Sequence, residues 1–244
     1  MIAAIIQARM GSSRLPNKVL MDIDGMPSLK FMIDRVMKSK HLEKIIIATT
    51  KDDKDKVIVD FCIDNNISFY CGSENDVLDR YYQSSKINNV TTIVRLTSDC
   101  PLIDPVLIDE TINLFRLKNV DYAANAAPPE IKKYPDGSDV EVFSFKALEK
   151  VWNEAKDLKD REHVTFYFWK KDKKFTTAML DNKYDWGKYR ITVDYKEDIE
   201  LVRKIVKKLN KQGKFGYMNE IIEILESNPE LLKINSMHSW GANW

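Results

Sequence analysis

Short apolar segments alternate with longer amphipathic segments along the first half of the chain. The first, residues 2–7, is continuous and rich in isoleucine, which is typical of a buried parallel strand. The predicted strands are 2–7, 45–49, 67–70 and 91–96, and the predicted helices are 27–39, 53–65, 76–85 and 105–117. This alternation predicts βαβ units, and therefore a Rossmann-like α/β fold with a mostly parallel sheet and helices on both faces.

The second half of the chain is less regular. Residues 123–139 contain three prolines and one glycine, so they predict a long loop, and long loops in compact domains often bind ligands. Further strands are predicted at 140–143, 175–181 and 189–193, and further helices at 145–154, 159–169, 198–208 and 219–227. Because no internal repeat or low-complexity linker separates the two halves, we expect one domain over residues 1–244.

Composition narrows the class of protein. Hydrophobic residues make up 44% of the chain, enough for a packed core, and the net charge of +1 does not favour nucleic-acid binding. No apolar stretch approaches the roughly 20 residues that cross a bilayer, so we expect no membrane span. The N-terminal apolar run has no basic segment before it. We therefore expect no signal peptide, a cytoplasmic protein, and reduced thiols at Cys62, Cys71 and Cys100.

A basic, hydroxyl-rich loop follows the first strand. Between Arg9 and Lys18 it holds one glycine, two serines and a second arginine, Arg14. A buried strand fixes such a loop in place, so that its N–H groups, hydroxyls and cations can surround a phosphate. The spacing matches neither a Walker A loop nor a G-x-G-x-x-G turn. The loop predicts a phosphate site, with an ordinary exposed basic loop as the alternative.

Two predicted strands end close to an aspartate. Asp99 follows the strand 91–96, and Asp194 follows the strand 189–193. Ligands of α/β sheets bind beyond the carboxyl ends of the strands, so both carboxylates should lie near the basic loop. Mg²⁺ prefers carboxylate and phosphate oxygens, which predicts a two-carboxylate magnesium site. A turn or helix-cap role is the alternative, and Asp198 competes with Asp194 for the cap of the next helix.

Three other residues are candidates for contacts with a second substrate. Asp139 and Glu141 lie two residues apart on a predicted strand and so share one face. They could bond to hydroxyls or to an amine, with solvated charges at a strand edge as the alternative. Histidine as a residue type titrates near neutrality, so His163 is a candidate general base, although a structural histidine that binds a loop carbonyl is the favoured alternative.

Taken together, six segments of the chain resemble the cytidylyltransferase superfamily, whose members activate acidic sugars as CMP conjugates. They occur in the same order as in that superfamily: 5–20, 72–81, 95–104, 136–143, 161–165 and 190–194. Within it, they resemble the SpsF-type branch of spore-coat and surface polysaccharide biosynthesis. Asn17 stands where the family usually has glycine. We expect this to alter loop flexibility rather than chemistry, because Lys18 is kept.

The resemblance implies a role for each candidate residue. It implies a nucleotide-diphospho-sugar transferase (GT-A-like) fold, in which residues 1–120 bind CTP and residues 121–244 bind the acceptor. The second half would contain an irregular insertion, and it could form the interface of a homodimer. The residues implied for nucleotide binding are Ala8, Arg9, Gly11, Ser12, Ser13, Thr49 and Arg80. Those implied for catalysis are Arg14, Lys18, Asp99 and Asp194, with the two aspartates as Mg²⁺ ligands, and those implied for the acceptor are Asp139, Glu141 and His163.

The implied reaction is attack by an oxygen of a small anionic acceptor on the α-phosphate of CTP, with release of pyrophosphate. Mg²⁺ would screen the phosphate charge, while Arg14 and Lys18 stabilise the pyrophosphate. Two other functions stay open. A glycosyltransferase of the same nucleotide-binding class usually has an Asp-x-Asp motif after a strand, whereas Asp22-Ile23-Asp24 comes early, in a predicted turn. A non-catalytic nucleotide-binding subunit would have no need of both aspartates beside the basic loop.

Overall fold

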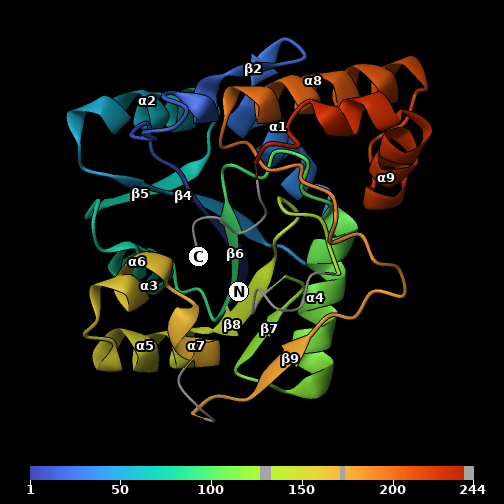
Figure 1. Cartoon of the computed structure of the whole chain (residues 1–244). Helices are drawn as coiled ribbons and strands as arrows, with labels where there is room; N and C mark the ends of the chain where they lie inside the picture. Colours follow the sequence, from blue (N-terminus) through green and yellow to red (C-terminus); the bar gives the residue numbers. More distant parts are fainter. Residues whose placement is uncertain (127–132, 171–173, 239–244) are drawn as a thin grey trace.

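A seven-stranded sheet forms the centre of the computed structural model, which describes residues 1–126, 133–170 and 174–238 (Figure 1). In spatial order, its strands are β5 Ser68–Gly72, β4 Lys44–Thr50, β1 Ile2–Gln7, β6 Thr92–Thr97, β8 Glu141–Ser144, β7 Tyr122–Ala124 and β9 Thr177–Met179. The first four are parallel, and β8 is antiparallel to both of its neighbours. The structure confirms the mostly parallel α/β sheet.

Helices cover both faces of this sheet, because successive side chains of a strand point to opposite faces. On β1, Ile2, Ala4 and Ile6 belong to one hydrophobic cluster, whereas Ala3 and Ile5 belong to another. The first cluster includes side chains of α1 Ser28–Val36, α2 Lys56–Asp64, α4 Pro105–Lys118, α8 Lys196–Lys211 and α9 Met218–Ser227. The second includes side chains of α3 Val77–Ile87, α5 Phe145–Glu154 and α7 Phe166–Lys170.

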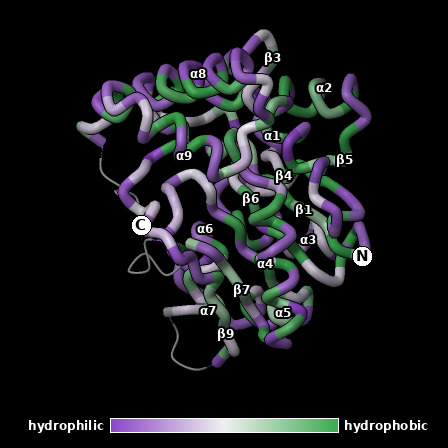
Figure 2. Tube along the Cα trace, turned by 90° about the vertical axis from the view of Figure 1, so that its right-hand side faces the viewer, coloured by the Kyte–Doolittle hydropathy of each residue, from purple (hydrophilic) through white to green (hydrophobic). Residues whose placement is uncertain are grey.

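The remaining elements are short. A hairpin joins β2 Asp22–Ile23 to β3 Met26–Pro27, α6 Leu158–His163 packs beside α3, and three 3₁₀ helices are η1 Lys18–Leu20, η2 Asp53–Asp55 and η3 Pro229–Lys233. Along α8, hydrophilic and hydrophobic positions alternate, as expected for a helix with one buried face (Figure 2). Within the described ranges, no helix is both long and apolar enough to cross a membrane.

Three predicted elements differ from the observed ones. The segment 189–193 is not a strand, and its single bridge joins Arg190 to Asp136. The predicted helix 159–169 is divided into α6 and α7 at Val164, whose φ of 58° interrupts the helix. The predicted loop 123–139 starts inside β7, and its residues 127–132 lie outside the described part of the chain, so its role in binding stays a prediction.

The sheet brings two loops to one edge. Gln7, at the end of β1, is paired in register with Thr97, at the end of β6. The loop 8–17 and the loop 98–104 therefore leave the sheet next to each other. This is the carboxyl edge at which parallel sheets bind their ligands.

A third segment, residues 190–194, reaches the same edge from the second half of the chain. The Val193 N–H donates to the Asp99 carbonyl at 2.7 Å, and the Ile191 N–H donates to the Asp136 carbonyl at 2.7 Å. Gly137 makes this approach possible. Its φ is +100°, and a Cβ at this position would lie 2.3 Å from the backbone nitrogen of Thr192, so no larger residue fits.

Candidate active site

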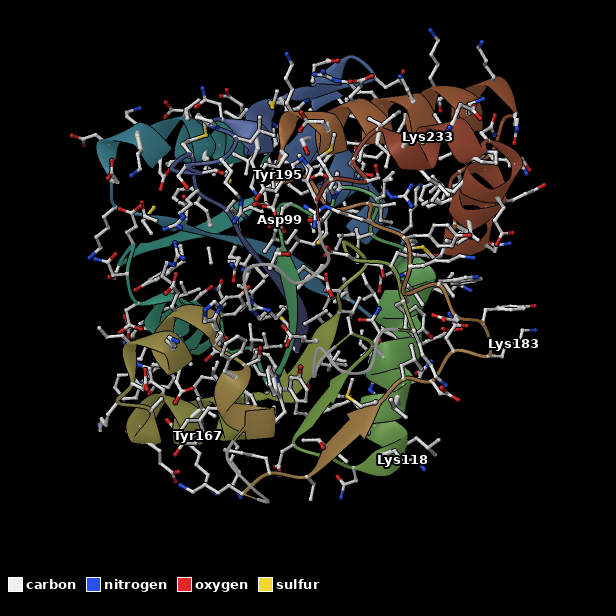
Figure 3. The ribbon with its side chains drawn as sticks, in the orientation of Figure 1. Asp99, Lys118, Tyr167, Lys183, Tyr195 and Lys233 are labelled. Carbon is white, nitrogen blue, oxygen red and sulfur yellow. The ribbon has the colours of Figure 1, made fainter. Side chains whose placement is uncertain are left out.

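A cleft of about 590 Å³ lies at this edge of the sheet. The predicted site residues that line it are Ala8, Arg9, Gly11, Ser12, Ser13, Arg14, Lys18, Arg80, Asp99, Asp139, His163 and Asp194. In Figure 3, Asp99 lies beyond the end of β6, close to Tyr195 at the start of α8. The structure therefore brings together residues that are up to 186 positions apart, from Ala8 to Asp194.

The Lys18 ammonium lies between the two predicted metal ligands. Its Nζ is 3.2 Å from Oδ2 of Asp99 and 2.8 Å from Oδ1 of Asp194, and it donates to the Val193 carbonyl at 2.9 Å. Burial alone would lower the pKa of Lys18, but the two carboxylates raise it overall, so the amine stays protonated. Asn17 precedes Lys18 with a φ of 61°, a left-handed conformation that asparagine tolerates.

Cations lie close to both aspartates. Burial alone would raise the pKa of Asp99, but Lys18 and a hydrogen bond from Thr97 lower it to about 2. Asp194 is only 7% exposed, and Nη2 of Arg14 lies 2.8 Å from its Oδ1. At neutral pH, Asp99 is therefore an ionised oxygen ligand beside the basic loop.

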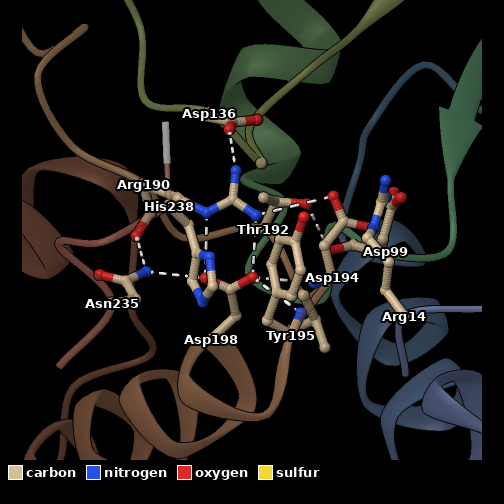
Figure 4. Close-up of polar contacts among 12 residues, drawn as sticks. Arg14, Asp99, Asp136, Arg190, Thr192, Asp194, Tyr195, Asp198, Asn235 and His238 are labelled. Atoms are coloured by element: carbon tan, nitrogen blue, oxygen red, sulfur yellow. Dashed lines mark hydrogen bonds and ion pairs between the residues drawn. The ribbon is translucent and has the colours of Figure 1, made fainter. Parts of the chain in front are cut away.

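Arg190 fixes the position of Asp194 from the other side (Figure 4). It donates to Asp136 at 2.6 Å and, through two nitrogens, to Asp198 at 3.0 and 2.8 Å. Asp198 also accepts the N–H groups of Asp194 and Tyr195, each at 3.0 Å. Asp198 thus satisfies backbone donors at the start of α8, which leaves the carboxylate of Asp194 free to face the cleft.

Asp55 anchors the basic loop, a role that sequence reasoning missed. Its carboxylate accepts the Met10 N–H at 2.6 Å and the Thr50 hydroxyl, and the residue is fully buried. In the sequence, Asp55 stands in the charged run 51–56, which resembles a solvated surface segment. No signal in that run separates it from its exposed neighbours.

The sequence pattern of the cytidylyltransferase family matches residues 3–228 of this chain. The chain therefore belongs to the cytidylyltransferase family. This result confirms the resemblance stated above and makes the protein a nucleotidyltransferase.

Similar proteins agree with the assignment of this cytidylyltransferase. The spore coat polysaccharide biosynthesis protein SpsF of Bacillus subtilis is 31% identical, over 94% of this chain and 95% of its own length. A cytidylyltransferase structure from Leptospira borgpetersenii superposes with a TM-score of 0.87 at 33% identity, covering 94% of this chain and 95% of that one. A CMP:2-keto-3-deoxy-manno-octonic acid synthetase complexed with CTP shares the fold, with a TM-score of 0.63 at 17% identity, over 85% of this chain and 98% of that one.

Two arginines, Arg9 and Arg80, line the cytidylyltransferase cleft where few carboxylates lie beside them. Arg9 has its carboxylate partner in Glu74, at 3.4 Å, and Lys54 shares that carboxylate at 3.2 Å. Arg80 is 2% exposed, and its Nε and Nη1 have no hydrogen-bond partner among the described residues. Burial lowers the pKa of Arg80 from its usual value. A buried guanidinium with unpartnered N–H groups beside a cleft can donate hydrogen bonds to an anionic or carbonyl ligand.

Two predicted residues do not line the cleft. Glu141 is 3% exposed, and its carboxylate is occupied by an ion pair with Arg95 and a hydrogen bond from the Tyr122 hydroxyl at 2.5 Å. It pairs directly with Arg95 across β8 and β6, so its charge is neutralised inside the sheet. Thr49 is fully buried on β4. Neither side chain faces the space where a substrate would bind.

Asp139 and His163 do line the cleft. Burial, followed by repulsion from Asp136 and Glu141, raises the pKa of Asp139 to about 8, so its carboxyl group is largely protonated at neutral pH. The His163 ring stacks on Phe166, with centroids 4.1 Å apart and planes 14° apart. This packing fixes the ring beside the cleft.

The donor set of Asp99 and Asp194 fits magnesium only in part. Within the described residues, no group of three or more His, Cys, Asp or Glu side chains could hold a metal ion. Two carboxylates that share one cation are, however, the protein ligands that Mg²⁺ commonly uses when phosphate oxygens and water complete its shell. The pair therefore fits a metal that arrives with a polyphosphate.

Proposed function

We propose that this cytidylyltransferase uses CTP and Mg²⁺ to transfer CMP to a small anionic acceptor, an acidic sugar or a phosphorylated molecule. One observation carries the proposal: Arg14 and Lys18 meet Asp99 and Asp194 in a single cleft. The similarity to SpsF, a spore coat polysaccharide biosynthesis protein, supports a role in surface polysaccharide synthesis, and the CTP-bound synthetase of the same fold supports CTP as the nucleotide.

The basic loop would hold the triphosphate. Ser12 and Ser13 line the cleft together with Arg9 and Lys18. Charge-assisted hydrogen bonds from such cations to phosphate are about twice as strong as neutral ones. In the reaction, an acceptor oxygen bonds to the α-phosphorus while the bond to the β-phosphate oxygen breaks, and pyrophosphate takes up the electron pair.

Asp99 and Asp194 would hold Mg²⁺, which when bound supplies charge to offset the crowded phosphates. The protein's own cations act on the same charge. Arg14 and Lys18 can donate to the departing pyrophosphate, because both are within reach of the loop that binds it. Preorganised donors of this kind stabilise charge that develops in the transition state.

The acceptor would bind beside Asp139. Because the carboxyl group of Asp139 is protonated near neutral pH, it can donate a hydrogen bond to an anionic acceptor instead of repelling it. The ring of His163 lies along the same cleft and can contact the acceptor. Since Glu141 is occupied by Arg95, it is not part of this proposal.

Pyrophosphate release tests the function directly. The protein is incubated with Mg²⁺, each of the four nucleoside triphosphates, and a panel of sugar acids and phosphorylated acceptors. Release with CTP alone, together with a CMP conjugate of one acceptor, is the expected result. Cleavage of a nucleotide sugar would favour a glycosyltransferase instead, and CTP binding without turnover on any acceptor would favour a binding subunit.

The Asp99→Asn variant tests the residue assignment. We expect it to keep the wild-type unfolding curve and to lose turnover, because one metal-ligand charge is removed. The Asp60→Asn variant is the matched control, since Asp60 forms a solvent-exposed ion pair with Lys56 on α2. It should retain full activity. Full activity in Asp99→Asn would contradict the metal assignment.

A further inference from the structure

The ammonium of Lys18 fills the gap that a metal ion would need. A lysine ammonium has three N–H donors. In this structure, all three have acceptors: Asp99, Asp194 and the Val193 carbonyl, at 3.2, 2.8 and 2.9 Å. Its side chain is only 12% exposed, so it is enclosed at this position. Mg²⁺ binds carboxylate oxygens at about 2.1 Å. An ion bound to the same two oxygens, Oδ2 of Asp99 and Oδ1 of Asp194, must therefore displace the ammonium.

We propose that Lys18 keeps divalent cations out of the Asp99–Asp194 pair until a polyphosphate draws its ammonium away. The inference rests on the proposed function, because it takes this pair to be the metal site. Metal binding then depends on nucleotide binding, and the free protein has only weak affinity for the metal.

The geometry of the basic loop supports such an exchange. Lys18 lies at the end of the loop that would hold the triphosphate, and phosphate oxygens are strong acceptors for an ammonium. Arg14 can likewise bind either a phosphate or a carboxylate, since its Nη2 is 2.8 Å from Oδ1 of Asp194. When both cations move to the phosphates, the partly exposed Asp99 and the buried Asp194 lose these partners, which is unfavourable until another cation arrives.

Arg190 does not take part in this exchange. Its guanidinium is held by Asp136 and by a two-nitrogen contact with Asp198, and it lies 3.6 Å from Asp194. Asp194 therefore keeps its position while its other cations change. Because the exchange links the two binding events, CTP must raise the affinity for the metal by the same factor as the metal raises the affinity for CTP.

Manganese binding to the nucleotide-free protein tests the inference. The free Mn²⁺ signal in electron paramagnetic resonance gives the dissociation constant for wild type and for Lys18→Met, which keeps the length of the side chain without its charge. We expect Lys18→Met to bind Mn²⁺ about tenfold more tightly, within the range of typical coupling between sites. Lys18→Arg, which keeps the charge, should stay close to wild type.

Lys56→Met is the matched control, because Lys56 pairs with a carboxylate on the exposed surface of α2 and its side chain is 73% exposed. It should bind Mn²⁺ as wild type does. If Lys18→Met binds Mn²⁺ no more tightly than wild type does, the role proposed here for Lys18 is wrong, while the proposed function still stands. If Mn²⁺ binds to no variant, even with CTP, the metal assignment in the proposed function fails as well.

A second measurement keeps the inference testable if Lys18→Met does not fold. In the presence of a chelator, CTP binds without a metal and must pull Lys18 away from Asp99. Asp99→Asn weakens that hold, so this variant should bind metal-free CTP several-fold more tightly than wild type. Unchanged or weaker binding would overturn the inference, because Lys18 would then be equally available with and without the carboxylate.

Discussion

Substitution of Asp55 should show how much the anchoring of the basic loop contributes, because Asp55 holds the loop without touching the groups proposed to carry out the reaction. It lies outside the cleft and is fully buried at the start of α2. One carboxylate oxygen accepts the N–H of Met10 at 2.6 Å, and the other is bonded to the hydroxyl of Thr50. Met10 stands between Arg9 and Gly11, so this contact ties the beginning of the basic loop to the body of the protein.

The size of the effect follows from the contacts that are lost. A hydrogen bond to a charged group contributes about 1.5–3 kcal/mol, and a donor left unpaired in a buried place costs about as much. Asp55→Ala removes the acceptor of both Met10 and Thr50, so we expect a loss of about 3 kcal/mol in the free energy of unfolding. Asp55→Asn keeps an oxygen for Met10 and should lose about 1 kcal/mol.

Urea unfolding and steady-state kinetics measure the two consequences separately. We expect Asp55→Ala to raise the KM for CTP about tenfold, the equivalent of about 1.4 kcal/mol of binding, with a smaller change in kcat. Asp52→Ala is the control, because Asp52 lies in the same charged run but its exposed side chain only caps the short helix η2, where it contacts Lys54. It should leave the KM for CTP unchanged and should lose less stability than Asp55→Ala.

Two outcomes would refute this reasoning. If Asp55→Ala is as stable as Asp52→Ala, the buried hydrogen bonds do not contribute as the structure implies. If it is destabilised but its KM for CTP is unchanged, Asp55 supports the fold without positioning the loop.

Three further predictions concern the segments that carry Asp194 and the acceptor side of the cleft. Gly137→Ala should destabilise the protein by about 3 kcal/mol in urea unfolding, because its φ is +100° and the new Cβ would meet the backbone of Thr192; a wild-type midpoint would contradict this. The carboxyl group of Asp139 has a folded-state pKa of about 8, against about 4 when unfolded, so wild type should lose stability relative to Asp139→Asn as pH rises from 4 to 8; parallel stability curves would refute it. Asn235→Ala should lower kcat/KM several-fold, because Asn235 donates to Asp198 at 2.8 Å and so supports Arg190; unchanged kinetics would show that this support is dispensable.

The central sheet and the basic loop could be predicted because local sequence determines both. An isoleucine-rich segment such as residues 2–7 can be buried only where both of its faces are covered, and this is how β1 packs. A loop that follows such a strand must therefore lie at the edge of the sheet. Arg9 and Lys18 in this loop, and Asp99 after β6, could therefore be expected at this edge, and all three line the cleft.

Predictions failed where distant contacts decide the local structure. The segment 189–193 has the apolar pattern of a strand, and Ile191 and Val193 are indeed buried. Their N–H groups, however, bond to single carbonyls of Asp136 and Asp99 in two different loops rather than to one strand. The periodicity of apolar residues indicates which side chains are buried, but it does not distinguish a strand from an irregular segment whose N–H groups bond to two separate loops.

Val164 shows the same limit in a helix. Its side chain is fully buried in the cluster that contains α3 and α5, yet its φ of 58° is one that β-branched residues rarely adopt. Local preference favours a continuous helix from 159 to 169, and packing overrides it. Glu141 is the corresponding case for charge: the sequence shows an acidic residue on a predicted strand, but only the register with Arg95 across β8 and β6 reveals that its side chain is paired inside the sheet.

The contact between Lys18 and Asp194 depends on elements from both ends of the chain. Lys18 lies before α1 and Asp194 lies before α8, and both helices contribute to one hydrophobic cluster, through Leu29 on α1 and Val202 on α8. On α1, Arg35 is buried and donates to carbonyls near the start of α4 and α9, at 2.9 and 2.6 Å. Since the packing of α1 and α8 sets where both charged groups lie, the geometry of the cation exchange is a property of the whole core and not of the basic loop alone.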